Sequence, residues 1–227
     1  MKERFIIILI VFFSITMILS LIGIISWLSE NKNVRDIVKE EEKYLIKDDD
    51  VIYLDKGIFS DNPDTVGWIR VEGTSINYPV VQYTDNDYYL KHDFKKEKNS
   101  AGWIFMDYQN SSDDQNIVIY GHHRRDGSMF GSIDLLFDSD FYKEHSNEII
   151  FITEDEVLVY KIFSVYKASS YDSYNLINFD SFDDEIIKIK NNSEINFEID
   201  FENVSQILTL STCHGNNKDR LVVHGII

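Results

Sequence analysis

The segment Gln206–Cys213, QILTLSTC, consists mainly of apolar and β-branched residues, and a polar loop, HGNNKD, follows its cysteine. This pattern predicts a strand that ends at Cys213, the only cysteine in the chain. The segment Arg220–Ile227 predicts a closing strand, which places Arg220 across a short loop from the thiol. Positive charge stabilises both a thiolate and a developing oxyanion. The pattern therefore indicates a candidate nucleophile beside a fixed cation.

A buried, inert cysteine is the ordinary alternative, because free cysteines are among the most buried residues. Two features favour chemistry instead. Cys213 closes its strand, and a second predicted strand, Asn116–Tyr120, runs directly into Gly121-His122-His123. A cysteine and a histidine at two strand ends, far apart in sequence, form the arrangement that a Cys–His nucleophile site needs.

These motifs resemble those of a known family. TLSTC at 209–213, with Arg220 following, resembles the active-site signature of sortases. YGHH at 120–123, followed by DGSMF at 126–130, resembles the histidine segment of class B sortases of Gram-positive bacteria. Further matches are NPDTVGWI at 62–69, YPVVQ at 78–82, DYYL at 87–90 and IFMD at 104–107. The resemblance covers about residues 55–227, with the motifs in the expected order.

The predicted fold is mainly β. Short apolar runs separated by turn signals favour a closed barrel or a sandwich. The resemblance implies a closed, mostly antiparallel sortase-like barrel of about eight strands, with helices at the N-terminus and in the long loop before the cysteine strand. Within that loop, Ser181 is a plausible N-cap with Asp184 three residues later, which predicts a helix from Phe182 to Ile189.

The resemblance also implies the chemistry. Cys213 would attack a peptide carbonyl as the thiolate, His122 would protonate the departing amine, and Arg220 would hold the carbonyl oxygen or its oxyanion. In the family pattern the histidine directly after glycine is catalytic, which selects His122 over His123. Residues that would line the substrate groove are Asn86, Leu90, Ser170, Tyr174 and Ser211.

Class B sortases cleave after the threonine of a short C-terminal sorting motif and transfer the acyl group to an amine of a cell-wall precursor. The implied partners are therefore exported proteins with a sorting signal and a lipid-linked peptidoglycan precursor. No metal or organic cofactor is implied. The sequence itself carries no C-x-x-C or H-x-x-x-H spacing that would indicate a metal site.

The N-terminal segment Phe5–Leu28 contains no charged residue and is long enough to span a bilayer as a helix. A cleaved signal peptide would have a shorter apolar region and a small-residue cleavage site, which Ile25-Ser26-Trp27-Leu28 does not provide. Lys2 and Arg4 favour a cytoplasmic N-terminus, although Lys32 and Arg35 weaken that bias. We therefore expect a single-pass protein of the cell membrane with an extracellular catalytic domain. The predicted organisation is an anchor at 1–28, a helical stalk at 29–54 and a catalytic domain at 55–227.

The formal net charge of −17 argues against a nucleic-acid partner, because phosphate binding needs a basic surface. Two other functions stay open on the sequence alone. The first is an extracytoplasmic cysteine protease that only hydrolyses, although papain-like enzymes place the cysteine before the histidine, the reverse of the order here. The second is a non-catalytic tethered binding module, which would keep its function without Cys213.

Overall fold

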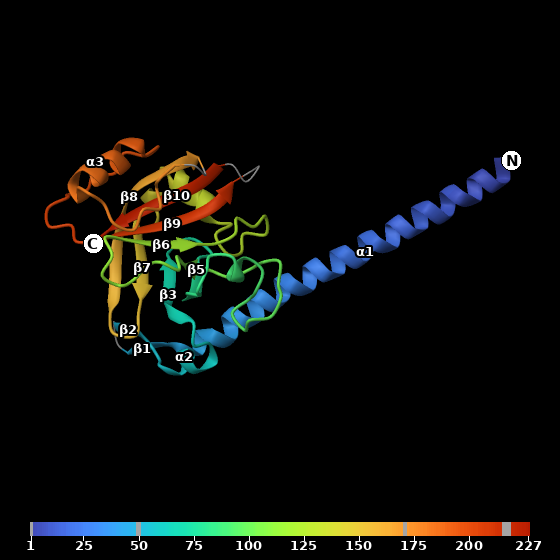
Figure 1. Cartoon of the computed structure of the whole chain (residues 1–227), viewed down its shortest axis with the longest axis horizontal. Coiled ribbons are helices and arrows are strands. Elements are labelled where there is room, and N and C mark those ends of the chain that lie inside the picture. Colours follow the sequence, from blue (N-terminus) through green and yellow to red (C-terminus); the bar gives the residue numbers. More distant parts are fainter. Residues whose placement is uncertain (1, 49–50, 170–171, 215–218) are drawn as a thin grey trace.

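The computed structural model describes residues 2–48, 51–169, 172–214 and 219–227. Eight strands close into a barrel in the order β10-β8-β7-β3-β4-β5-β6-β9 (Figure 1). Their bounds are β3 Thr65–Val71, β4 Asn77–Val81, β5 Phe105–Met106, β6 Asn116–Tyr120, β7 Glu148–Ile152, β8 Val157–Ser169, β9 Ile207–His214 and β10 Asp219–Ile226. The predicted closed barrel is confirmed, and the sandwich alternative is wrong.

Neighbouring strands run antiparallel except in two places, where β4 pairs with β5 and β6 pairs with β9 in parallel. The β6–β9 pair joins segments that lie far apart in sequence, and its last register pair is Tyr120 with Ser211. Because parallel strands end at the same edge of a sheet, the chain leaves both strands at one rim of the barrel.

The main hydrophobic core of the domain contains large side chains from strands and loops. Trp68, Trp103, Phe130 and Tyr160 are fully buried, and burying a side chain of this kind contributes roughly 2–3 kcal/mol to stability. The closed, well-filled barrel gives the loops at its rim a rigid base.

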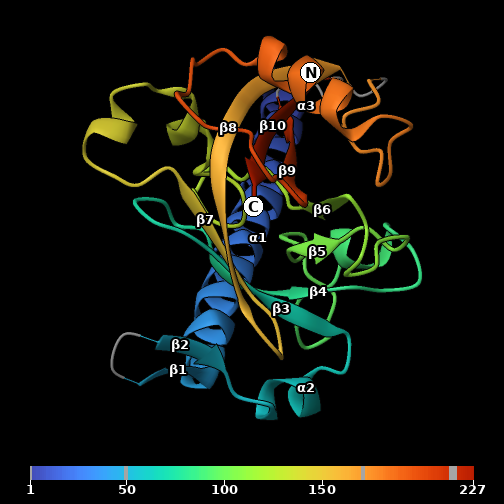
Figure 2. The same ribbon diagram turned by 90° about the vertical axis from the view of Figure 1, so that its left-hand side faces the viewer.

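Short helical segments connect the strands: α2 Gly57–Asp61, η2 Tyr88–Leu90, η3 Ile133–Phe137 and η4 Phe141–Lys143. The long loop between β8 and β9 carries α3, Phe182–Asn192, which lies outside the barrel (Figure 2). The Ser181 side chain caps this helix by accepting a hydrogen bond from the Asp184 N–H at 3.4 Å, as the sequence predicts. Ile186 and Ile189 bury its inner face. The predicted helix before the cysteine strand is confirmed.

The first helix, α1, runs without interruption from Lys2 to Glu41 and projects far from the barrel (Figure 1). Its apolar part is exposed along its length and suffices in length and composition for a membrane span. The C-terminal part of α1 is different, because Asn31, Val34, Ile37 and Glu41 are buried against the domain. One helix therefore joins the apolar segment to the barrel.

The segment 29–54, expected as a helical stalk, is α-helical only as far as Glu41. After α1, a turn of 3-10 helix, η1 Glu42–Tyr44, leads into a hairpin of β1, Leu45–Asp48, and β2, Val51–Leu54. The hairpin register pairs Leu45 with Leu54. Two short apolar runs flank the acidic run 48–50, and such a pattern suits two paired strands better than one helix. The first half is also no free stalk, since α1 packs on the barrel.

The buried His224 of β10 predicts a specific acid sensitivity. Its Nδ1 donates to Thr209 Oγ1 at 2.8 Å, since the Thr209 hydroxyl donates to Asn116 Oδ1. Burial lowers the pKa of His224 to about 3. Between pH 6.5 and 3 the unfolded chain binds a proton that the folded chain does not. The free energy of unfolding should therefore decrease as the pH is lowered, by up to about 1.4 kcal/mol per pH unit.

The measurement is urea denaturation at pH 4 to 8 of the fragment 29–227, which retains every buried residue of α1. We expect His224→Gln to be less stable at pH 7 and to show a flatter dependence between pH 6.5 and 4. Equal slopes in the two proteins would contradict the assignment of this sensitivity to His224.

Candidate active site

β6 and β9 run toward the same rim of the barrel, where β6 ends at Tyr120 and β9 continues to His214. Beyond the Tyr120–Ser211 pair, the Gly121 N–H donates to the Ser211 carbonyl at 3.2 Å. His122 and Cys213 are the second residues after that pair on their respective segments. On the other side of β9, Cys213 is in register with Arg220 of β10. The backbone therefore brings the three predicted catalytic positions to one rim.

A cavity of about 300 Å³ opens at this rim. Six of the predicted site residues line it: Asn86, Leu90, His122, Tyr174, Ser211 and Arg220. Cys213 directly follows Thr212, which also lines the cavity. The predicted groove residue Ser170 lies outside the described residues. Positions predicted separately from the histidine segment, the Tyr-Leu segment and the long loop thus meet in one place.

The imidazole of His122 is held by the segment around η2. Its Nε2 lies 2.8 Å from the Leu90 carbonyl oxygen. Because a carbonyl oxygen only accepts, this contact assigns a proton to Nε2 and leaves Nδ1 as the atom that can take up or give a proton. Gly102, at φ +60°, lies behind the ring. A Cβ there would come within 2.9 Å of His122 Cδ2 and 2.6 Å of the Tyr89 carbonyl oxygen, so glycine is required.

The neighbouring His123 has a different environment. Its Nε2 lies 2.7 Å from Asp134 Oδ2 of η3, and its backbone forms a bridge with Met129. His123 is absent from the lining of the cavity, whereas His122 is part of it. The two rings therefore have separate partners, and His122 is the one that the fold brings to the predicted site.

One wall of the cavity is a polar network around Asp107. The side-chain amide of Asn86 and the hydroxyl of Tyr120 each donate to Asp107 Oδ2 at 3.0 Å, and Asn86 Oδ1 accepts from the Tyr108 N–H at 3.0 Å. Burial raises the pKa of Tyr120, so its hydroxyl stays protonated at neutral pH. These bonds fix the orientation of the Asn86 amide at the cavity.

A second part of the lining comes from the long loop between β8 and β9. The Ser211 hydroxyl donates to the Tyr174 hydroxyl at 3.0 Å, and the Asn175 amide donates to the Tyr120 hydroxyl at 3.2 Å. The loop is thereby tied to both β9 and β6. This anchoring places Tyr174 at the cavity although its sequence neighbourhood is polar and turn-rich.

Five further lining residues were not predicted: Phe105, Tyr120, Gly121, Asn175 and Thr212. Gly121, Asn175 and Thr212 are each a direct sequence neighbour of a predicted site residue, so adjacency could have identified them. Phe105 and Tyr120 are paired across β5 and β6, a long-range contact for which the sequence offers no local signal.

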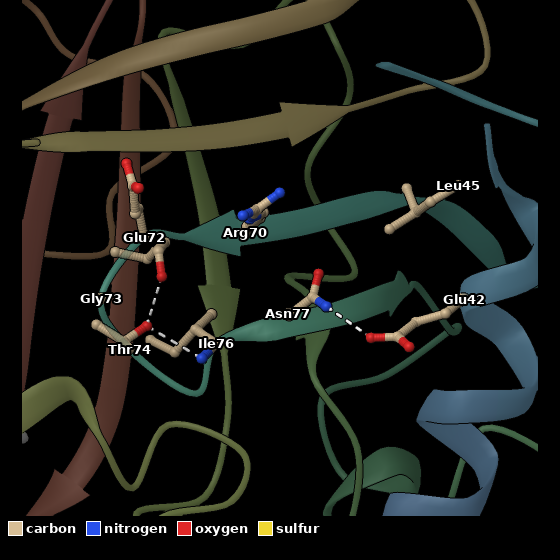
Figure 3. A pocket seen from close by; sticks show the side chains of 9 residues that line it. Glu42, Leu45, Arg70, Glu72, Gly73, Thr74, Ile76 and Asn77 are labelled. Carbon is tan, nitrogen blue, oxygen red and sulfur yellow. Dashed lines mark hydrogen bonds between the residues drawn. The ribbon is translucent and has the colours of Figure 1, made fainter. Parts of the chain in front are cut away.

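Another hollow, of about 420 Å³, lies between the β3–β4 turn and the chain after α1 (Figure 3). Asn77 donates to Glu42 there at 3.0 Å, and Thr74 donates to the Val71 carbonyl at 2.8 Å. None of the predicted site residues is among the described residues that line it. Across the described part of the chain, no group of three His, Cys, Asp or Glu side chains could hold a metal ion.

The sequence around this site matches a known protein family. A model of the sortase domain matches residues 69–226, more than half of the chain. The chain belongs to the sortase family. Among curated sortases, sortase B of Listeria monocytogenes is 38% identical over 174 residues, which cover 72% of this chain and 70% of the relative. Sortase B of Staphylococcus aureus is 35% identical over 170 residues, covering 71% and 69%.

Solved sortases share the fold. The sortase B of Bacillus anthracis in complex with AAEK1 has a TM-score of 0.77 at 34% identity and covers 88% of this chain and 98% of its own. The Staphylococcus aureus sortase B–substrate complex has a TM-score of 0.75 at 29% identity, covering 87% and 95%. Because these relatives and solved structures are sortases B, this chain is a class B sortase. Sortases are cysteine transpeptidases, so the chain is an enzyme that anchors proteins to the cell wall.

Proposed function

We propose that the protein is a membrane-anchored transpeptidase that cleaves a C-terminal sorting motif after threonine and joins the new carboxyl end to a peptidoglycan amine. The observation that carries the proposal is the cavity lined by both His122 and Arg220, at the point where β9 reaches Cys213. A nucleophile, a proton donor and a cation are the groups that acyl transfer requires, and the proposal assigns them to Cys213, His122 and Arg220.

In the first half-reaction, the Cys213 thiolate attacks the threonine carbonyl, and the C–N bond of the peptide breaks. His122 in its protonated form gives its Nδ1 proton to the departing amine, while its Nε2–H continues to donate a hydrogen bond to the Leu90 carbonyl oxygen. Arg220 stabilises the oxyanion of the tetrahedral intermediate. The products are a thioester on Cys213 and the released C-terminal peptide.

In the second half-reaction, an amine attacks the thioester carbonyl, loses a proton to His122 and displaces the thiolate. The result is a new amide bond and free Cys213. Water performs the same step slowly, so access of the amine decides between transfer and hydrolysis. The two fixed walls support the proposed role of Asn86, Leu90, Tyr174 and Ser211 in holding the sorting motif. Ser170 stays a prediction.

The proposed site of action is the outer face of the cell membrane. The apolar part of α1 would anchor the chain, with the barrel outside. Confinement to the membrane raises the effective concentration of exported substrates and of lipid-linked precursor. The proposed domain division remains an anchor at 1–28, a linking segment at 29–54 and the catalytic domain from 55.

The experiment uses residues 29–227 with peptides of the Asn-Pro-x-Thr or Ser/Pro-Pro-x-Thr type. Mass spectrometry should detect an acyl-enzyme adduct on the intact protein. Addition of diaminopimelate-type or oligoglycine amines should then yield a ligated peptide that increases with amine concentration at the expense of hydrolysed peptide. If only hydrolysed peptide forms with every amine, the protein is a cysteine protease under these conditions and the transfer proposal fails.

A further inference from the structure

The loop that follows His122 closes back onto His122 itself. The Phe130 N–H donates to the His122 carbonyl oxygen at 3.1 Å, and the Gly131 N–H donates to the Ser128 carbonyl at 2.9 Å. The Met129 N–H donates to the buried Tyr78 hydroxyl at 2.9 Å. A shift of this loop is therefore transmitted to the backbone that carries the imidazole.

Arg124 is the buried centre of that loop. Its side chain is only 11% exposed, and its Nε lies 3.1 Å from Ser128 Oγ and 3.4 Å from Asp126 Oδ1. Its Nη2 donates to Oδ1 of Asn31, which is 4% exposed and belongs to α1. A guanidinium at such depth needs an acceptor for each buried N–H. Among these acceptors, Asn31 is the one from outside the loop.

The same turns of α1 also contact the segment on the other side of the imidazole. The Ser100 hydroxyl donates to a carboxylate oxygen of Glu30, and the Asn33 amide donates to Asp93 Oδ2 at 3.4 Å. This second segment ends at Gly102, which lies against the His122 ring, and begins next to Leu90, whose carbonyl holds Nε2. α1 thus bonds to both segments that fix the ring.

We propose that Asn31 is a positioning residue for His122, acting through Arg124, so that the helix carrying the apolar segment also sets the geometry of proton transfer. The inference rests on the proposed role of His122. Without the Asn31 acceptor, Arg124 turns toward water and the loop between His122 and Phe130 moves with it. The cavity walls around Asn86 and Tyr174 are separate from this contact, so substrate affinity should change little.

The test compares full-length chains in lipid nanodiscs, with a sorting-motif peptide as substrate. We expect Asn31→Ala to lower kcat about tenfold and to change KM less than about twofold, because a small displacement of a proton donor affects the transition state more than binding. Asn31→Asp keeps an acceptor for Arg124 and should restore most of kcat. Lys32→Ala, an exposed neighbour on the same helix, is the matched control and should behave as wild type.

Two further measurements separate positioning from mere stability. Arg124→Ala combined with Asn31→Ala should lose no more kcat than the single variants, because the two residues act as one pair. The Nε2 and Cε1 resonances of His122, followed by NMR against pH, should shift in Asn31→Ala whether or not the peptide is turned over, which keeps this inference distinguishable from a failure of the proposed function. An unchanged His122 spectrum, or a lower melting temperature with wild-type kcat and pH profile, would overturn it.

Discussion

Cys213→Ala is expected to abolish both cleavage and transfer, with turnover falling by at least about 10³-fold. The physical reason is that neither the His122 imidazole nor Arg220 can replace the nucleophile that forms the thioester. Because Cys213 is the only cysteine in the chain, any thiol adduct can be assigned to it without mapping. The measurement is a peptide cleavage assay together with the intact mass after incubation with a sorting-motif peptide.

The control for this prediction is Cys213→Ser, which preserves the shape of the side chain but has a hydroxyl of much higher pKa. It should melt at the wild-type temperature and be nearly as inactive as Cys213→Ala, which would show that the loss is chemical. If either variant cleaves the peptide at the wild-type rate, the nucleophile is not Cys213.

His122→Ala should lower kcat by about 10²- to 10⁴-fold, the range expected for removal of a general acid–base group. His123→Ala is the matched control, since it removes the same ring one residue away. His123 is paired with Asp134 at 2.7 Å, outside the cavity lining, and its loss should cost no more than a few-fold in rate. Both variants are compared at pH 6 to 9, where loss of the acid–base group should also remove the pH dependence that it causes.

The reverse result would reassign the catalytic histidine: an inactive His123→Ala beside an active His122→Ala. The double variant adds an internal check. If His122 alone performs the proton transfers, kcat of the double variant should be lower than that of His122→Ala only by the small effect of His123→Ala.

The sequence predicted the features that depend on local pattern. Apolar runs between turn signals predicted the barrel strands, and Ser181 with Asp184 predicted the start of α3. The strand ends at Tyr120 and Cys213 predicted where a Cys–His site would form. The parallel register of β6 with β9 supports that placement, because it sets the two segments side by side at one rim.

Other features depend on contacts between segments that no local pattern records. The burial of Asn31 and Glu41 was not predictable, because polar residues on a charged helix normally face water. The Asp107 network joins the side chains of Asn86 and Tyr120, which lie far from each other in sequence, so no motif spacing reveals it. The β1–β2 hairpin was missed because charged residues around its apolar positions suited an amphipathic helix equally well.

The unbroken course of α1 has a mechanical consequence for the proposed anchored enzyme. Residues 29–41 continue the apolar segment as one helix, and at 1.5 Å per residue they amount to about 20 Å. Because Asn31, Val34 and Ile37 of this segment are packed against the domain, a stiff helix would limit both the height and the tilt of the proposed anchored enzyme. If α1 anchors the chain as proposed, the enzyme would search for substrates in two dimensions, in a thin layer above the lipid headgroups. An enzyme so held would meet only substrates that lie at the right depth in the envelope, before their sequence is tested.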